Sequence, residues 1–352
     1  MTDKKRKSGS IFLRLILALF VIFSAGIGIN KVLNTDFEDL SDLDRDVISE
    51  YDKFIASGES LWKDYKLEDK DLVFVNKNAF GRAYLISKND ISSIFAKEIN
   101  FSKKKPYKVY RISRFYPKRI NYIMGNFNTN GKTYKLLGLD NIFYIKYTDE
   151  SISKKLTSKH FMPNLSHEAY HYYMQGDWKN LSFRGLSYDE DELDLLDREY
   201  QILDEINNGI DNDISKDELL ELTRSYLDIM YERIKNTDKE KLESELFEET
   251  MEGIANYITI KTAKLVGYDY DIMYFENTKD VNFSDVVPTI RKGDVGQDIL
   301  GEKIVYESGA VLTKLIERLE DDDTWQDEIN RRGSKDLTLY SFIKENYGKW
   351  RK

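Results

Sequence analysis

The sequence predicts an α+β fold in which a small, mostly antiparallel sheet precedes a larger helical region, with a transmembrane helix at the N-terminus. An apolar run, a group of short β-branched and aromatic runs, and a long stretch of helical periodicity support this prediction. We therefore divide the chain into a cytoplasmic tail (1–10), a transmembrane signal anchor (11–30), a helical connector (31–71), a β-rich region (72–150) and a helical region (151–352).

Composition limits the classes of function that the chain can have. Its 352 residues suffice for two compact domains. Hydrophobic residues make up 41% and charged residues 33%, which is typical of a globular protein. The net charge of -9 argues against nucleic-acid binding, which needs clustered Lys and Arg. The chain has no cysteine, so it has neither disulfides nor thiolate metal ligands. We predict no partner protein.

The N-terminal segment has the features of a membrane anchor. A positive cluster at residues 4–7 precedes an apolar run over 11–29, which only Arg14 and Ser24 interrupt. A bilayer core needs about 20 apolar residues in a helix, and the positive flank keeps the N-terminus in the cytoplasm. The small residues in "FSAGIG" would suit a cleaved signal peptide, but the apolar run continues past them, so we expect an uncleaved anchor.

This prediction gives the chain a location. Residues from about 31 onward lie outside the cytoplasm with either kind of signal. The high content of Lys, Asn, Asp and Ile is typical of an AT-rich bacterial genome. We therefore expect a single-pass protein of a bacterial cell membrane, with its larger part extracellular.

The connector and the β-rich region differ in periodicity. Leu40, Leu43, Val47 and Tyr51 are spaced as on a helix that leads away from the membrane. Between 72 and 148 we predict strands in "LVFVN", "RAYLIS", "YKVYRISRF", "INYIMGNF", "TYKLLGL" and "NIFYIKYT". Asn130-Gly131 predicts a type I′ hairpin turn.

Helical periodicity dominates the rest of the chain. Apolar residues recur at three- and four-residue steps over 191–210, 215–235, 239–267 and 302–322. Ser215 and Glu218 are spaced as a capping box at the start of the second of these helices.

Two of the three histidines lie in "LSHEAYHY", residues 165–172. We expect a helix here, since Pro163 suits a first helical turn and Gly176 suits a helix end. His167 and His171 then share one face, four residues apart, and can bind one Zn²⁺. Glu168 beside them is the general base of the His-Glu-x-x-His pattern. The third histidine, His160, lacks helical spacing to the pair and is expected either to support the structure or to contact the metal ligands from outside.

A simpler interpretation is that both histidines are ordinary residues of an amphipathic helix. A chance match to His-Glu-x-x-His is improbable in a chain so poor in histidine, so we favour the metal site. Three protein ligands and an open position are usual for catalytic zinc, and the third ligand here is expected to be a carboxylate. Asp177, six residues after His171, matches a partial metzincin-type extension.

The acidic run in "FEETMEGIANYI" offers the other candidates for this ligand. Glu252-Gly253-Ile254-Ala255 resembles the Asn-Glu-Gly-Phe-Ala motif of aminopeptidase-N-like gluzincins, with Met251 in place of the Asn. The resemblance to gluzincins, which include thermolysin, implies a zincin-like fold, peptidase activity and Glu252 as third ligand. Glu248 and Glu249 remain alternatives. Asn256, one turn further on, is expected to orient a ligating imidazole.

A third match extends the resemblance. "VYESGAVLTKL" is similar to the Tyr-x-Lys-Gly-Ala stretch of the same branch, with Ser308 in place of the Lys. By this match Tyr306 is a catalytic residue that stabilises the oxyanion. The resemblance covers roughly residues 140–330 and implies that the helices between His171 and Glu252 are insertions. The Gly-x-Met-Glu-Asn motif that binds a substrate's free amine is missing, so aminopeptidase specificity is not implied.

The sequence thus predicts a membrane-anchored, extracytoplasmic zinc peptidase that acts on a peptide or protein substrate. The alternative is an anchored surface binding protein with a structural or vestigial zinc site.

Overall fold

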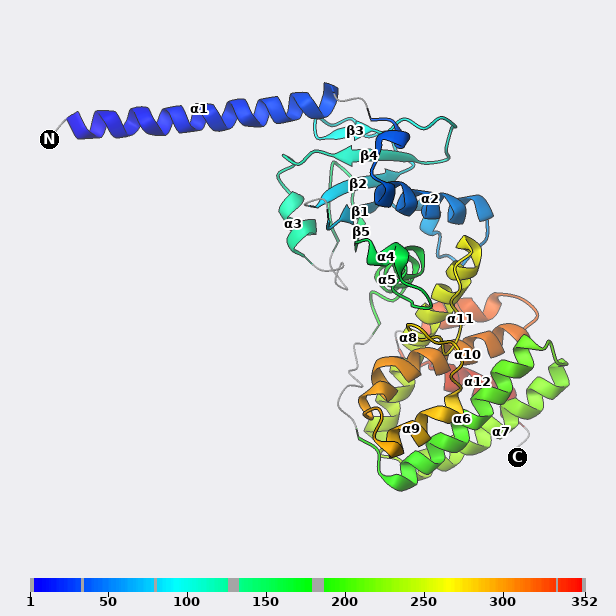
Figure 1. The fold of residues 1–352 in the computed structure, drawn as a ribbon. Helices are drawn as coiled ribbons and strands as arrows, with labels where there is room; N and C mark the ends of the chain where they lie inside the picture. Colours follow the sequence, from blue (N-terminus) through cyan, green and yellow to red (C-terminus); the bar gives the residue numbers. More distant parts are fainter. Residues whose placement is uncertain are drawn as a thin grey trace. The chain divides into compact units, whose positions relative to one another are not determined.

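The computed structural model describes residues 3–32, 35–78, 81–125, 133–178, 187–333 and 335–349 (Figure 1). The chain forms two compact units, the first made of residues 1–49 and 68–152 and the second of residues 50–67 and 153–352. The first unit contains a five-stranded sheet, and the described part of the second unit is helical. The α+β class predicted from the sequence is confirmed.

Helix α1 (Asp3–Val32) begins the first unit and extends beyond the sheet (Figure 1). Its segment Phe12–Val32 is long and apolar enough to cross a membrane, and it is the one such segment among the described residues. A signal sequence near an N-terminus has the same length and composition. Anchoring by α1 is therefore part of the function proposed below.

The sheet has the strand order β3-β4-β2-β1-β5. Its strands are β1 (Leu72–Asn76), β2 (Arg82–Ser87), β3 (Ala96–Glu98), β4 (Lys108–Ile112) and β5 (Phe143–Tyr147). Three pairings are antiparallel, and β5 lies parallel to β1 at one edge. The mostly antiparallel sheet is confirmed, with a parallel edge that makes it mixed.

Two predicted strands are wrong. "INYIMGNF" is helical over its described part, as α3 (Arg119–Met124), because a single turn of helix buries Tyr122 in the sheet's core while Ile120 and Met124 remain exposed. "TYKLLGL" is irregular and contains only an isolated bridge between Leu136 and Leu139. The turn expected at Asn130-Gly131 lies outside the described residues.

Both faces of the central strands are buried, which explains their continuous apolar sequences. Val73, Leu85 and Ile112 on one face pack with Tyr122 of α3. The N-terminal part of α2 (Asp42–Ser57) contributes Asp44 to the other face. The central strands of the sheet are thus covered on both faces.

Asp44 is fully buried and binds three strands. Its Oδ1 accepts hydrogen bonds from Asn76 Nδ2 and the Tyr147 hydroxyl, both at 2.6 Å. Its Oδ2 accepts from the Tyr84 hydroxyl at 2.7 Å and from Arg82 at 2.8 Å. Burial disfavours the charge, but the hydrogen bonds from Tyr147, Asn76 and Tyr84 hold the pKa of Asp44 below its usual range.

The connector expected over residues 31–71 is not a separate region. The division between the two units falls at residues 49 and 50, inside α2, and the segment up to residue 67 belongs to the helical unit. The short 3₁₀ helices Phe37–Asp39 and Leu67–Asp69 flank α2. Trp62 and Tyr65 are buried in the helical unit, so this stretch is part of its core.

The helical unit begins at Ser153, close to the boundary expected at residue 151. Its helices, after the short α4 (Glu150–Ser153) that closes the first unit, are α5 (Phe161–Met174), α6 (Glu190–Asp211), α7 (Lys216–Asn236), α8 (Lys239–Val266), α9 (Val286–Lys292), α10 (Val305–Leu319), α11 (Thr324–Arg332) and α12 (Leu339–Tyr347). A 3₁₀ turn at Phe283–Asp285 precedes α9, and a π-helical turn, η4 (Leu300–Ile304), precedes α10. The predicted capping box of Ser215 and Glu218 is present at the start of α7.

Helices α6 and α7 lie side by side (Figure 1). The guanidinium of Arg233 on α7, which is 1% exposed, pairs with Glu199 of α6 at 2.6 Å and with Glu245 of α8 at 2.7 Å. A buried guanidinium of this kind requires such paired carboxylates. The helices between the histidines and Glu252 are therefore fixed to α8 by a buried ion cluster.

Candidate metal centre

Helix α5 carries the histidine motif, as the sequence predicts. Phe161, Leu165 and Ala169 form its buried stripe at steps of four residues, and Pro163 lies in the first turn. Trp62 and Tyr65 pack against Tyr170 at ring distances of 5.9 and 5.3 Å. The apolar back of the helix thus fixes the direction of its polar face.

Three donor atoms from two helices converge in front of this face. His167 Nε2 and His171 Nε2 are 3.1 Å apart, and Glu252 Oε2 of α8 lies 3.3 Å from the first and 3.2 Å from the second. A tetrahedral zinc ion with bonds of about 2.0–2.1 Å keeps its ligand atoms about 3.3 Å apart. The three atoms therefore form a nearly equilateral triangle that matches one face of such a tetrahedron.

Thr259 orients the imidazole of His167. Its hydroxyl donates to the Ala255 carbonyl at 2.9 Å and lies 3.1 Å from His167 Nδ1. Because the hydroxyl hydrogen is already used, the Thr259 oxygen accepts a hydrogen bond from the Nδ1–H of His167. Nε2 of a neutral His167 then carries the lone pair that a metal needs.

Gln175 orients His171 in the same way. Its Nε2 donates to the Met251 carbonyl at 3.0 Å, so its Oε1 faces His171 Nδ1 at 2.5 Å and accepts a hydrogen bond from the Nδ1–H. Gln175 is fully buried and connects α5 to α8 one residue before Glu252. Both imidazoles thus present Nε2 to the same point.

The sequence contains a signal for one of these two residues. Gln175 follows His171 by four residues on the same helix face, which a search for partners of the ligands would have found. Thr259 lies on another helix and has no local signal. Both residues were missed.

The role expected for Asn256 therefore belongs to Thr259 and Gln175. Asn256 instead donates to the main-chain carbonyl of Tyr306 at 3.3 Å and accepts from the hydroxyl of Tyr270 at 3.1 Å. It connects α8 to α10, the helix that carries Tyr306.

Among the described residues, His167, His171 and Glu252 are the one group of three with such donor atoms within 4.8 Å of one another. Asp177 is exposed beyond the end of α5. Glu249 is 4% exposed, and its Oε1 accepts from Ser308 at 2.5 Å. Glu248 is half-buried and lies outside the group. The geometry thus favours Glu252 among the carboxylates considered.

Gly253 allows α8 and α10 to touch. A Cβ atom at Gly253 would lie 2.3 Å from the Cα of Gly309, and one at Gly309 would lie 2.0 Å from the Glu249 carbonyl oxygen. The helix that Gly253 admits is α10. The effect of this contact is to bring Tyr306, three residues before Gly309, to the cavity that Glu252 faces.

The triangle opens into a cavity of about 440 Å³. Its lining includes Glu168, Tyr306 and Asn256, together with Glu302 and Lys303 of the π-helical turn. The ring of Tyr306 lies parallel to the His167 imidazole, with their centroids 6.2 Å apart. All the residues predicted to form the site therefore line one cavity.

The charges within the triangle shift two pKa values. Burial opposes protonation of His171, but the Glu252 carboxylate outweighs it and raises the pKa of His171 to about 9. Burial likewise disfavours charge on Glu252, yet the two imidazoles hold the pKa of Glu252 well below its usual range. The metal-free triangle therefore contains a proton that a cation would replace.

His160 lies away from the triangle. Its Nε2 is 2.5 Å from Glu50 Oε1, and its ring stacks on Tyr268 with centroids 3.8 Å apart. The residue is 4% exposed and immediately precedes α5. It supports the start of the helix, which agrees with the structural one of the two roles expected for it.

Comparison of the chain with family models, with curated proteins and with solved structures finds no significant match.

Proposed function

We propose that the chain is a membrane-anchored, extracytoplasmic zinc peptidase of gluzincin type. The observation that carries this proposal is the triangle of His167 Nε2, His171 Nε2 and Glu252 Oε2, whose edges of 3.1–3.3 Å fit a tetrahedral zinc ion. Two imidazoles and one carboxylate are also a usual donor set for catalytic zinc. The zincin-like fold is part of the same proposal.

The residues that face the cavity supply the remaining chemistry. Zinc held by the triangle would supply an acidified water and polarise a peptide carbonyl. Glu168 lines the cavity and takes the proton of the attacking water, which it then passes to the departing amine. The hydroxyl of Tyr306 donates to the oxygen on which negative charge develops.

The anchor is the second part of the proposal. The apolar segment Phe12–Val32 spans the bilayer as an uncleaved signal anchor, and the basic residues before it remain in the cytoplasm. The sheet of the first unit and the whole helical unit then lie outside the cell, where peptide or protein substrates reach the cavity.

Metal analysis joined to a cleavage assay tests the proposal. Purified full-length protein is expected to hold about one zinc per chain and to cleave members of a peptide library. Glu168→Gln should keep the zinc and lose at least about 10³-fold in cleavage rate, because it removes the general base. Glu243→Gln, an exposed change on α8, is the matched control and should behave as wild type.

Two outcomes would overturn the peptidase. One is a Glu168→Gln protein that cleaves as fast as wild type. The other is a wild-type protein that retains zinc tightly and cleaves nothing in the library, which would favour a structural zinc site in a surface binding protein.

A further inference from the structure

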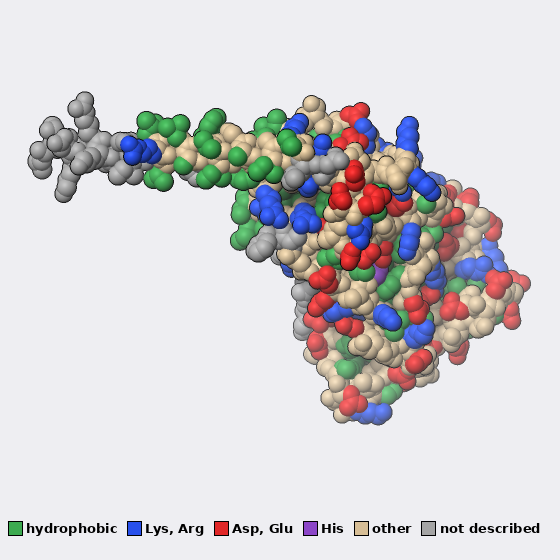
Figure 2. Space-filling model, turned by 45° about the horizontal axis from the view of Figure 1, so that its top comes forward, with side chains coloured by type: hydrophobic (Ala, Val, Ile, Leu, Met, Phe, Trp, Pro, Cys, Tyr) green, Lys and Arg blue, Asp and Glu red, His purple; other side chains and the backbone are tan. Residues whose placement is uncertain are grey.

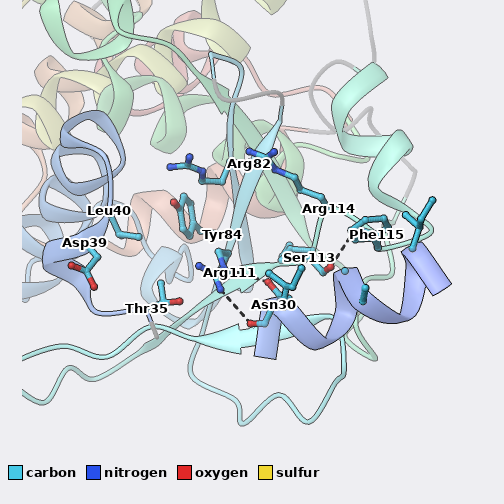
Figure 3. A pocket seen from close by; sticks show the side chains of 15 residues that line it. Asn30, Thr35, Asp39, Leu40, Arg82, Tyr84, Arg111, Ser113, Arg114 and Phe115 are labelled. Atoms are coloured by element: carbon cyan, nitrogen blue, oxygen red, sulfur yellow. Dashed lines mark hydrogen bonds between the residues drawn. The ribbon is translucent and has the colours of Figure 1, made fainter. Parts of the chain in front are cut away.

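A second cavity, of about 670 Å³, lies in the first unit between the C-terminal end of α1 and the sheet (Figure 3). Residues of α1 form one wall, among them Ile22, Ala25 and Ile29. Arg82, Arg111 and other residues of the sheet and its loops form the opposite wall. One side of the cavity is therefore apolar and the other is basic.

Specific contacts hold α1 against the sheet at this point. Phe23 makes edge contacts with Phe95 and Phe115, both at centroid distances of 6.1 Å. Gly26 leaves room for the ring of Phe115, which a Cβ atom would meet at 2.0 Å. Arg111 donates to the side-chain oxygen of Asn30 at 3.3 Å and to its carbonyl at 3.2 Å. The contact between Asn30 of α1 and Arg111 of β4 thus joins the two walls of the cavity.

The lining has an excess of positive charge. It contains Arg82, Arg111 and Arg114 but only one acidic residue, the exposed Asp39. Asp44 outside the lining pairs with one nitrogen of Arg82. Burial lowers the pKa of Arg111, and the charge of Arg82 lowers it further. An anion in the cavity would relieve this repulsion.

Asn30 supplies a second, independent sign of a missing ligand. It lines the cavity and is 8% exposed, yet its side-chain nitrogen has no acceptor among the described residues. A buried donor without a partner is costly. Asn30 and Arg111 lie next to each other in the cavity (Figure 3), where a ligand with several acceptor oxygens would complement both.

Exposed apolar side chains lie around the cavity. Ile94 and Phe115 are 52% and 38% exposed, and α1 itself is apolar around its circumference. Figure 2 shows basic side chains beside hydrophobic ones where α1 meets the rest of the chain. Asn30 is two residues from the end of Phe12–Val32, so with this segment across the bilayer the Asn30–Arg111 end of the cavity lies at the depth of the outer lipid headgroups, and Ile22 lies deeper.

We propose that the cavity binds one anionic phospholipid of the outer leaflet. Its phosphate is held by Arg111, Arg82 and Arg114, and its acyl chains lie along the apolar wall of α1. A phosphate suits guanidinium groups because it accepts two hydrogen bonds from one fork. This inference rests on the proposed anchor but does not depend on the peptidase activity.

Lipid titration of the full-length protein in neutral detergent tests the proposal. Phosphatidylglycerol should bind in native mass spectra at about one molecule per chain, well ahead of phosphatidylcholine. Arg114→Gln should weaken binding about fivefold, and Arg111→Gln with Arg114→Gln about 25-fold. Lys103→Gln with Lys104→Gln removes equal charge from the same unit outside the cavity and should have no effect.

Arg114→Gln alone keeps the test valid if the double variant misfolds. Arg114 is exposed, whereas Arg111 makes a structural hydrogen bond to Asn30. Equal binding of the two lipids, or equal losses in the cavity and control variants, would overturn the proposal. Displacement of the lipid by millimolar inorganic phosphate would also overturn it, in favour of a site for free anions. If alkaline carbonate extracts the protein from membranes, the proposed anchor is overturned as well. If the protein stays in the membrane but binds no lipid in the titration, only the lipid site is overturned.

Discussion

Gly253 and Gly309 touch backbone to backbone where α8 crosses α10. Glu252 precedes the first glycine by one residue, and Tyr306 precedes the second by three. The contact therefore determines how far the proposed metal ligand Glu252 and the proposed catalytic residue Tyr306 lie from each other.

Gly253→Ala is expected to separate the two helices. The added methyl group would overlap the Gly309 backbone, so we expect a loss of roughly 2–3 kcal/mol in stability and a lower zinc content. Thermal unfolding and metal analysis of the full-length protein measure both. Gly176→Ala is the control, because its methyl group would meet only the Tyr172 carbonyl, at 3.3 Å. Unchanged zinc content in Gly253→Ala would contradict the role given to this contact.

Gln175→Leu should weaken zinc binding without removing a ligand. The change deletes the acceptor that orients His171, so the zinc affinity is expected to fall about 10- to 100-fold. Competition with a chromogenic chelator measures this affinity. Gln201→Leu, an exposed change on α6, should leave it unaltered. An affinity equal to wild type in Gln175→Leu would show that the hydrogen bond does not position the imidazole.

Tyr306→Phe separates binding from catalysis under the proposed function. Loss of the hydroxyl should lower kcat about 100-fold or more while zinc content and melting temperature stay as in wild type. Steady-state kinetics on a cleaved library peptide gives kcat and KM separately. The exposed Tyr231→Phe is the control. A change confined to KM would mean that Tyr306 binds substrate without stabilising the transition state.

Zinc binding at pH 7 should release about one proton. His171 has a pKa of about 9 in the metal-free triangle, so its imidazole is protonated at pH 7 and must lose the Nε2 proton to bind a metal. Zinc affinity should therefore rise about tenfold per pH unit from pH 7 to 9 and then level off. Calorimetry in two buffers with different ionisation enthalpies counts the protons. Glu252→Gln should release fewer, and proton-free binding by wild type would refute the prediction.

Asp44 should make stability depend on pH in the acid range. Its native pKa lies below the unfolded value of 3.8, so its stabilisation is complete above that value and is lost as the pH falls through the native pKa. Asp44→Asn should cost roughly 2–3 kcal/mol at pH 7, and its difference from wild type should shrink below pH 4. Melting temperatures between pH 3 and 7 measure this, with the exposed Asp46→Asn as control. A difference independent of pH would contradict it.

The helices were predictable where local signals agree. Periodicity and caps place α6, α7 and α8 within a few residues of their observed bounds, because amphipathic spacing and the Ser215 cap are properties of neighbouring residues. β3 was missed because "AKE" has no strand preference of its own and is ordered by pairing with β4. α3 was mistaken for a strand because its Ile and Tyr residues favour strands locally, while burial of Tyr122 decides the conformation.

The three proposed metal ligands also differ in how far local sequence signals predict them. His167 and His171 are one helical turn apart, so their proximity follows from local geometry. Glu252 reaches them only through the packing of α8 against α5, and the sequence indicated it through a resemblance to other proteins. Whether Glu252 or Glu249 faces the histidines depends on which side of α8 packs against α10. The local sequence does not predict this packing.

The π-helical turn before α10 makes this stretch one residue longer than an α-helix with the same number of turns. Each residue of an α-helix turns the chain by about 100°. Deleting one residue there would rotate Glu302 and Lys303 around the helix axis, while Tyr306 and Gly309 would keep the phase that the glycine contact imposes. A change in chain length can thus alter the rim of the cavity and leave Tyr306 and Gly309 in their positions against α8.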